Sequence, residues 1–545
     1  MRRAFVTPGD GSRQVHYRRL GNGPPVVVLP AAPDSSLAAA PFSTGLAARG
    51  GTVFALDTPG YGESDPLSGA DPAMEDFADA LASTFDALGL ECADVVGSGS
   101  GATLAAAFAV RHHRRVQSLV LQEPVTSQPE QRAWMQSNYT PSLAPEWDGS
   151  HLLRAWMIRH DMHVFRPWFV RTPAARLSAS LPEPDELHRE FVDLLRAGER
   201  WGDADQAALR FDLPAALANV HVPIRERFAE SEAHPSMRAA DTAHRSGRAA
   251  DTRAHGHTHG VPARLASTRA GFTREYVDVS FGQVHVRRAG PNGVPLLMLH
   301  ASPSSSRTVL PLAEMLSQHR PVVAIDTPGF GESDALAATD PGIGEFADAV
   351  LEVIHALGVG PLDVYGSHTG ALIALEAAVR GPERVRRVVV DGLPVFSPQE
   401  KADHLAHYIP VFEPRSDGSH VVWGWNFIRN MILFYPWYQQ DPAHATSRAP
   451  STSMLHERVV DLMKAGAHYA LGYGAAYRYS TRAALAELTV PAMLCVAHDD
   501  VLAHHAAAVR QQRPDLAVTW LDPADRLGAT RSAIQAFLSA EGAND

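Results

Sequence analysis

The chain has 545 residues, 45% hydrophobic and 20% charged, which is enough apolar material for two or more folded domains. Its formal net charge of −12 and the lack of any basic stripe argue against a nucleic-acid partner. Two cysteines, Cys92 and Cys495, cannot make a disulfide framework, and no apolar stretch has membrane-spanning length. The first residues also lack the apolar run of a signal peptide, so we expect a cytoplasmic protein.

One internal repeat organises the sequence. LDTPGYGESD at 56–65 recurs as IDTPGFGESD at 325–334, and DGSH at 148–151 recurs as DGSH at 417–420, each 269 residues later. The offset slips by one near the end, where Val222-Pro223 matches Val490-Pro491. A register held this long predicts two tandem domains, 1–250 and 271–545, joined by a linker at 251–270.

The junction between the copies has a biased composition. The string RAADT occurs twice within 238–260, followed by alternating histidines, His255, His257 and His259. On a strand these histidines would share one face and could hold a metal. A solvated, histidine-rich link explains the composition more simply, and we predict no metal site.

The second copy shows a regular alternation of predicted elements. A hairpin at 276–288 turns at Gly282, short apolar runs at 295–299, 321–325, 362–365 and 388–390 are typical of buried parallel strands, and helical patterns cover 343–357 and 370–379. Residues 396–480 break the alternation and predict a cap inserted over the sheet, as do residues 126–210 of the first copy, before a strand resumes at 490–496. The pattern predicts an α/β fold, with a mostly parallel sheet, flanking helices and a helical cap in each copy.

Three motifs in the second copy mark the carboxyl ends of these strands, where α/β sheets bind ligands. They are HASP at 300–303, DTPGFGES at 326–333 and GSHTG at 366–370. Their order resembles that of the α/β-hydrolase superfamily, in its capped branch of epoxide hydrolases, haloalkane dehalogenases and carbon–carbon-bond hydrolases. The resemblance covers nearly all of each copy and implies that GSHTG is the strand–helix turn that carries the family's nucleophile.

That turn presents an unusual residue. A sharp strand–helix turn lifts one side chain above the sheet and aims the next backbone amide at the same point. Here the lifted side chain is His368, and the amides of Thr369 and Ser302 would form an oxyanion hole, with Ser367 and His300 beside it. The turn is atypical for the family because histidine replaces serine or aspartate.

The partner acid of His368 has two candidates. Asp500 matches the family's acid after a late strand, and Asp391 follows the strand at 388–390. The family's late-loop histidine is missing, because Arg526 stands at its position. In the cap, His420 fits a structural turn of the repeated DGSH, and Trp437 is expected in the core or as a substrate wall.

The first copy lacks this machinery. Pro30 stands for His300, Gly99 for His368 and Glu232 for Asp500, so we expect a degenerate domain that packs against the second copy. Ser100 acting from a shifted turn is the alternative.

The leading functional prediction is cofactor-free hydrolysis of a small ester, lactone or carbon–carbon bond in the second copy. His368 would serve there as nucleophile or as base. A lyase or isomerase that uses His368 as base is one alternative, and a non-catalytic binding or scaffold protein is another. We expect a small-molecule substrate and no metal or organic cofactor; the oligomeric state stays open.

Overall fold

The computed structural model describes residues 1–125, 129–225 and 271–539. The predicted linker, its histidines and Glu232 lie outside these residues. By its contacts the chain divides into two units, one of residues 1–141 and 199–273, the other of residues 142–198 and 274–545. No helix among the described residues is long and apolar enough to cross a membrane.

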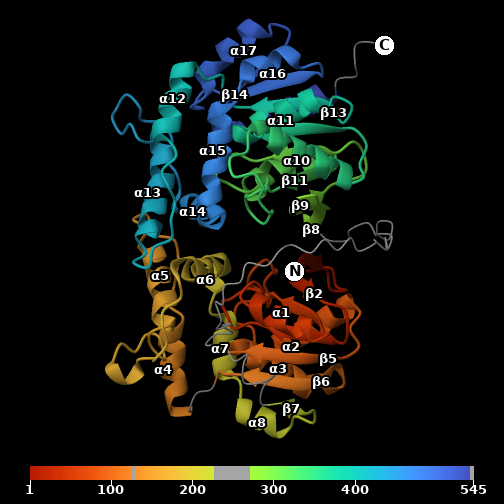
Figure 1. The fold of residues 1–545 in the computed structure, drawn as a ribbon, viewed down its shortest axis with the longest axis vertical. Helices are drawn as coiled ribbons and strands as arrows, with labels where there is room; N and C mark the ends of the chain where they lie inside the picture. Colours follow the sequence, from red (N-terminus) through yellow and green to blue (C-terminus); the bar gives the residue numbers. More distant parts are fainter. Residues whose placement is uncertain (126–128, 226–270, 540–545) are drawn as a thin grey trace. The chain divides into compact units, whose positions relative to one another are not determined.

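The second copy contains an eight-stranded sheet in the order β15-β14-β13-β12-β10-β11-β9-β8 (Figure 1). β10 to β15 pair with one another in parallel, and β9 pairs antiparallel with β11. The strands are β8 (Thr273–Val279), β9 (Gly282–Ala289), β10 (Leu296–Leu299), β11 (Val322–Ile325), β12 (Leu362–Ser367), β13 (Val385–Asp391), β14 (Ala492–Ala497) and β15 (Ala517–Leu521). The apolar runs of the sequence therefore form strands in the predicted chain order.

Helices flank this sheet because their apolar faces repeat with helical spacing. Phe346, Val350 and Val353 of α10 and Leu372 and Leu375 of α11 are buried in one core with the strands. The flanking helices are α9 (Leu310–Ser317), α10 (Ile343–Ala356), α11 (Thr369–Arg380), α16 (Thr481–Glu487), α17 (Ala506–Gln512) and α18 (Arg526–Ser539). This arrangement confirms the predicted α/β architecture.

The first copy contains a seven-stranded sheet in the order β1-β2-β4-β3-β5-β6-β7. Its strands are β1 (Arg2–Val6), β2 (Val15–Leu20), β3 (Pro25–Leu29), β4 (Thr52–Leu56), β5 (Ala93–Ser98), β6 (Val116–Gln122) and β7 (Ile224–Arg225). The helices of this unit are α1 (Ala40–Ala48), α2 (Met74–Leu88), α3 (Ser100–Arg111), α4 (Pro129–Tyr139), α7 (Asp203–Arg210) and α8 (Leu213–Ala218). The counterpart of β14 is β7, of which the structure describes Ile224–Arg225.

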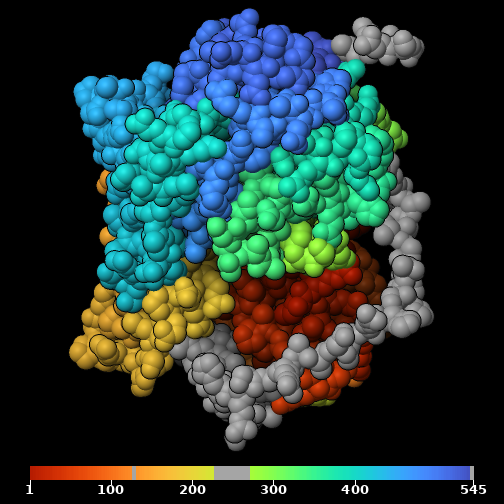
Figure 2. All heavy atoms as spheres, turned by 45° about the horizontal axis from the view of Figure 1, so that its top comes forward, coloured from red at the N-terminus to blue at the C-terminus, as the bar shows by residue number. Residues whose placement is uncertain are grey.

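Helical caps follow β13 in the second copy and β6 in the first. The second copy's cap contains α12 (Pro398–His407), α13 (Ser419–Leu433), α14 (Thr452–Ala465) and α15 (Tyr469–Arg478). In the first copy, α5 (Ser150–Met162) and α6 (Pro184–Ala197) belong to the same unit as the second copy. α5 contacts α13, and α6 contacts α14, along a boundary that we call the cap seam (Figure 2).

The cap seam is reciprocal. His151 Nε2 lies 3.1 Å from His456 Nδ1, and His188 Nδ1 lies 3.1 Å from His420 Nε2. In the repeat, His420 is the counterpart of His151 and His456 that of His188, so each pair joins the same two positions from opposite copies. Such self-complementary pairing is typical of two-fold symmetric dimers, here within one chain.

Aromatic rings follow the same reciprocity. Trp156 packs edge-on against His420, and its counterpart Trp425 packs edge-on against His151. A Cβ at Gly149 would lie 2.7 Å from the Trp425 ring, and one at Gly418 would lie 2.5 Å from the Trp156 ring. Two glycines with positive φ thus admit the two indoles, which explains why both copies keep the DGSH turn.

Candidate active site

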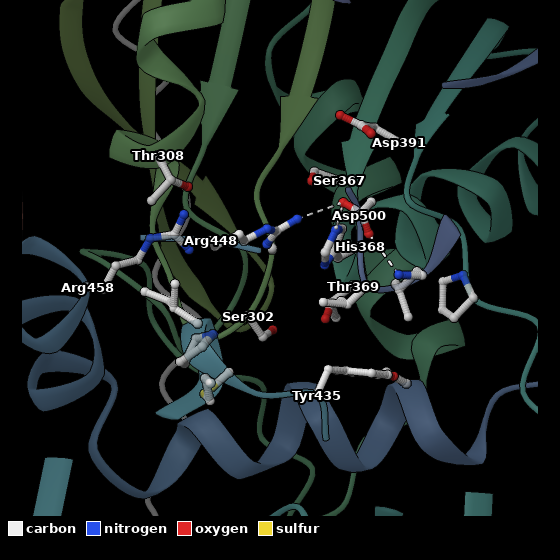
Figure 3. Close-up of a pocket in the computed structure, with 18 of the residues that line it drawn as sticks. Ser302, Thr308, Ser367, His368, Thr369, Asp391, Tyr435, Arg448, Arg458 and Asp500 are labelled. Atoms are coloured by element: carbon white, nitrogen blue, oxygen red, sulfur yellow. Dashed lines mark hydrogen bonds and ion pairs between the residues drawn. The ribbon is translucent and has the colours of Figure 1, made fainter. Parts of the chain in front are cut away.

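A cavity of about 680 Å³ lies in the second copy, between the carboxyl ends of the parallel strands and the cap (Figure 3). Six of the residues singled out from the sequence line it: Ser302, Ser367, His368, Thr369, Asp391 and Asp500. They come from the loop after β10, the β12–α11 turn, the end of β13 and the loop after β14. The topology thus brings together residues that are up to 198 positions apart in the chain.

The turn between β12 and α11 has the geometry expected of a nucleophile elbow. His368 alone separates the last residue of β12 from the first of α11, and its φ is +51°, a strained value for a residue with a side chain. Its backbone amide donates to the Asp391 carbonyl at 2.8 Å. Gly370 is required by close packing, because a Cβ there would lie 2.5 Å from the Leu299 carbonyl oxygen.

The imidazole of His368 occupies space that a neighbouring glycine leaves open. A Cβ at Gly392 would lie 2.6 Å from His368 Cδ2 and 2.8 Å from its Nε2. In the first copy the residue that corresponds to His368 is Gly99, and the residue that corresponds to Gly392 is Glu123. The glycine there stands at the elbow, and the residue with a side chain stands opposite it. The glycine and the residue with a side chain have therefore changed places between the two copies. Only the second copy has room for a side chain at the elbow.

His368 is paired with Asp500. His368 Nε2 lies 3.1 Å from Asp500 Oδ2, which also accepts a hydrogen bond from Arg526 at 2.9 Å. Burial raises the pKa of Asp500, but His368, the Leu502 amide and Arg526 outweigh it and hold that pKa well below its usual range. With Asp500 ionised, Nε2 is the donor, which leaves the lone pair of the imidazole on Nδ1.

Asp391, the other candidate acid, has a different role. Its Oδ2 accepts a hydrogen bond from the Tyr365 hydroxyl at 2.8 Å, and its Oδ1 lies 3.6 Å from Arg526. Burial raises its pKa, against the opposing effects of Arg526 and Tyr365. Among the described contacts, no side-chain hydrogen bond joins Asp391 to His368, so Asp500 is the acid that orients the imidazole.

His300 lies behind the cavity wall and not on it. Its buried ring donates from Nδ1 to the Ala301 carbonyl at 2.9 Å and accepts the Thr327 amide at Nε2, at 3.0 Å. Burial lowers the pKa of His300, against an opposing effect of Asp326, and a neutral ring fits both bonds. His300 therefore anchors the loop that carries Ser302, a supporting position in place of the pocket position we expected.

Trp437 also lies away from the cavity. Its indole donates to the Tyr408 carbonyl at 3.0 Å and packs edge-on against Phe427. It packs within the cap and is not among the residues that line the cavity. The aromatic side chains that do reach the cavity include Tyr408, Tyr435 and Tyr473.

Sequence reasoning missed two cationic residues of the cavity, Arg448 and Arg458. Arg458 Nη1 donates to the Ser304 hydroxyl at 3.0 Å, and no ion pair of Arg458 occurs among the described residues. Asp461, on the next turn of α14, is instead bonded to Ser305. The internal repeat did hold a signal, since the counterpart of Arg458 in the first copy is Glu190.

Among the described residues of the first copy, the space over the elbow is far smaller. The space lined by Pro30, Ala32 and Ser100 has a volume of about 10 Å³. The Ala32 amide, counterpart of the Ser302 amide, donates to the Ser100 hydroxyl at 2.9 Å. A Cβ at Gly99 would also lie 2.8 Å from Ala31 Cβ. The Ser100 hydroxyl thus occupies the hydrogen-bonding position in front of that amide.

Comparisons with known proteins agree with the fold. A family model described as the alpha/beta hydrolase fold matches residues 24–204 and 294–517. The (E)-2-((N-methylformamido)methylene)succinate hydrolase of Acinetobacter baylyi is 37% identical over 98 residues, 18% of this chain and 37% of that protein. The 2-hydroxymuconate semialdehyde hydrolase of Pseudomonas sp. is 33% identical over 140 residues, 25% of this chain and 43% of that protein. The chain spans less than half the length of these relatives.

Solved structures are similar to one copy at a time. E-2-(Acetamidomethylene)succinate hydrolase matches at 22% identity with a TM-score of 0.37, over 49% of this chain and 100% of that one. Epoxide hydrolase A from Mycobacterium thermoresistibile matches at 18% identity with a TM-score of 0.39, over 49% of this chain and 98% of that one.

Proposed function

The chain belongs to the α/β-hydrolase family, and from that premise we propose that its second copy hydrolyses a small carbonyl compound that bears a carboxylate. The reacting bond is an ester, a lactone or a carbon–carbon bond next to the carbonyl. The observation that carries the proposal is the His368–Asp500 pair at the elbow, facing the cavity beside Ser302 and Thr369. The first copy contributes structure and no chemistry.

In the proposed catalytic step, His368 acts as a general base. Nδ1 takes a proton from water, the resulting hydroxide attacks the carbonyl carbon, and negative charge develops on the carbonyl oxygen. The amides of Ser302 and Thr369 stabilise that oxygen, while Asp500 stabilises the imidazolium. When the tetrahedral intermediate collapses, the imidazolium returns the proton to the leaving oxygen or carbon. Direct attack by Nδ1, which would form an acyl-imidazole, uses the same groups.

We propose a carboxylate on the substrate because Arg458 offers a positive charge to bind it. An arginine side chain that is enclosed by protein and lacks an ion pair is costly, unless a ligand supplies the opposite charge. Burial lowers the pKa of the Arg458 guanidinium, against the opposing effects of Asp461 and Tyr473. Arg448, between Arg458 and His368 in the view of Figure 3, adds a second cation, at 3.4 Å from Asp500. A carboxylate at Arg458 would leave a carbonyl group free to reach the elbow.

A screen of esters, lactones and β-diketones, with and without a carboxylate, tests the reaction class. We expect turnover of carboxylate-bearing compounds, with one oxygen from ¹⁸O-labelled water in the acid product. Turnover without label would instead show an elimination or isomerisation with His368 as base. Tight binding of such compounds without turnover would favour a binding protein.

The anchoring role of Arg458 has its own test. In Arg458→Gln, kcat/KM for an acidic substrate should fall roughly 10- to 100-fold, the value of a charge-assisted hydrogen bond. The matching neutral amide should be turned over at an unchanged rate. Arg415→Gln, in an exposed part of the cap, serves as the control. Equal loss on both substrates would remove the carboxylate from the proposal and leave the hydrolysis intact.

A further inference from the structure

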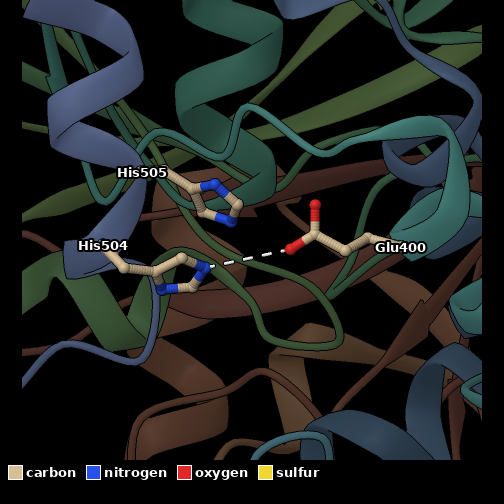
Figure 4. A group of neighbouring side chains, drawn as sticks. All are labelled: Glu400, His504 and His505. Atoms are coloured by element: carbon tan, nitrogen blue, oxygen red, sulfur yellow. Dashed lines mark ion pairs between the residues drawn. The ribbon is translucent and has the colours of Figure 1, made fainter.

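Three metal-binding side chains converge outside the catalytic cavity (Figure 4). Glu400, His504 and His505 point toward one another, and one ligand atom from each lies within 4.8 Å of the other two. Glu400 belongs to α12, the first helix of the cap, whereas the two histidines follow β14. The cluster therefore joins the cap to the loop that also carries Asp500.

His505 supplies an independent indication of a ligand. The residue is only 4% exposed, yet its buried Nε2 has no hydrogen-bond partner. Buried polar atoms are nearly always satisfied, so an orphan nitrogen facing a carboxylate and a second imidazole indicates a missing partner.

The chemistry of the three groups selects the kind of partner. Two imidazoles and one carboxylate suit Zn²⁺ and its neighbours in the transition series, whereas Mg²⁺ and Ca²⁺ prefer oxygen ligands alone. In a tetrahedral zinc site neighbouring ligand atoms are about 3.4 Å apart. His504 and Glu400 are both partly exposed, with side-chain exposures of 58% and 39%, and are free to close that distance on the buried His505.

We propose that Glu400, His504 and His505 form a binding site for a divalent transition metal, best suited to Zn²⁺, with a fourth position open to water. The site fastens α12 of the cap to the turn after β14. It is separate from the catalytic site, and no step of the proposed hydrolysis passes through it.

The position of the cluster gives the metal a structural consequence. The Phe396 ring packs edge-on against His505 and also lines the cavity. The Ala503 amide donates to the Asp500 carbonyl at 2.9 Å, so the turn that carries both histidines also holds the acid loop. Metal binding therefore stabilises the cap and the acid loop as one piece, and the effect is visible in stability without any substrate.

The experiment measures metal binding to the full chain. His255, His257 and His259 are changed to glutamine in every variant, because that run could bind zinc by itself. The chain is stripped with a chelator and titrated with Zn²⁺ against a chromophoric competitor, and Co²⁺ is added separately to record its visible spectrum. We expect one Zn²⁺ per chain, a higher melting temperature, and Co²⁺ bands of low-symmetry four- or five-coordination.

Two variants and one control decide the result. His505→Gln and Glu400→Gln should each weaken Zn²⁺ binding more than about 10-fold and abolish the rise in melting temperature. Glutamine at 400 keeps a group able to cap α12, so the second variant separates metal loss from unfolding. His407→Gln, an exposed histidine of the same helix, should bind like the parent. Binding that is absent in the parent, or unchanged in both variants, overturns the proposal.

Discussion

The imidazole of His368 fits at the elbow because the residue across from it, Gly392, has no side chain. The first copy shows the opposite solution, Gly99 with Glu123, and Glu123 there has a φ of +45°. In the second copy a side chain at position 392 would clash with His368, and in the first copy one at position 99 would clash with Ala31. This pair of positions therefore decides which copy has a functional group over the sheet.

Gly392→Ala tests that packing directly. The new Cβ would force the imidazole away from Asp500, so we expect kcat to fall roughly 100-fold, the lower range for loss of a general base. Gly358→Ala is the matched control, because Gly358 has a similar positive φ and nothing within 4 Å of an added Cβ. Both variants should lose about 1–2 kcal/mol of stability from the backbone alone. Equal activity in the two variants would contradict the packing argument.

Arg526 fixes the chemistry that the elbow can support. It pairs with Asp500 at the position where the family resemblance predicts a histidine, and a guanidinium cannot accept a proton. His368→Ser would restore a hydroxyl nucleophile with no base to activate it. We expect this variant to retain less than about 1% of the wild-type rate in a steady-state assay. A serine variant with substantial activity would show that Asp500 or water alone suffices as base.

At the scale of elements, the cap seam combines three buried histidines, His151 of α5, His188 of α6 and His420 of α13, with the partly buried His456 of α14. Burial lowers the pKa of His456 to about 4. Burial and, as the smaller cause, the second ring of the pair lower the pKa of His151 to about 4 and that of His420 to about 3. Burial also lowers the pKa of His188. All four rings are therefore neutral in the folded protein near pH 7, and each pair can share one hydrogen bond.

The seam predicts a specific pH dependence of stability. Unfolded histidines titrate near pH 6.5, so between about pH 6.5 and pH 4 the unfolded chain binds protons that the folded seam does not. The free energy of unfolding should be highest above pH 6.5 and fall as the pH drops through this window. Chemical denaturation across the window measures it. In the double variant His151→Gln with His456→Gln, the free energy of unfolding should change less steeply with pH. An unchanged slope would show that groups outside this histidine pair cause the pH dependence.

Much of this fold could be predicted from the sequence, for physical reasons that differ by element. β10 to β13 were recognisable as short apolar runs, because parallel strands are buried on both faces. The elbow was recognisable because its glycines are required by close backbone approach. The sequence could not decide which acid pairs with His368. Asp391 and Asp500 lie at the ends of adjacent strands, and only the directions of their side chains distinguish them. Arg458 was missed because its proposed role depends on the lack of a nearby carboxylate among the described residues, which only the three-dimensional structure shows.

For the whole molecule, the cap seam divides the chain differently from the sequence repeat. The predicted boundary placed 126–210 with the first copy, whereas residues 142–198 form one unit with the second copy. The reason is the reciprocal packing of α5 and α6 on α13 and α14, reinforced by the Arg196–Glu332 ion pair at 3.1 Å. The first copy thus supplies to the second what an identical subunit would supply in a dimer.

A fragment of residues 271–545 tests whether the cap seam is self-complementary. Without α5 and α6 it exposes the seam surfaces of α13 and α14, and a second fragment can offer the equivalent helices. We expect a dimer by light scattering on a sizing column. Gly418→Val in the fragment should give monomers or aggregate, because a Cβ there would meet the opposing indole. A stable, monomeric wild-type fragment would refute a self-complementary seam.

The most direct test of the account compares the two elbows within one chain. His368→Ala should lower kcat/KM by roughly 100- to 10,000-fold, the contribution of a positioned base, with an unchanged melting temperature. Ser100→Ala, at the elbow of the first copy, should leave the rate at the wild-type value. Full activity in His368→Ala, or a comparable loss in Ser100→Ala, would contradict the assignment of catalysis to the second copy.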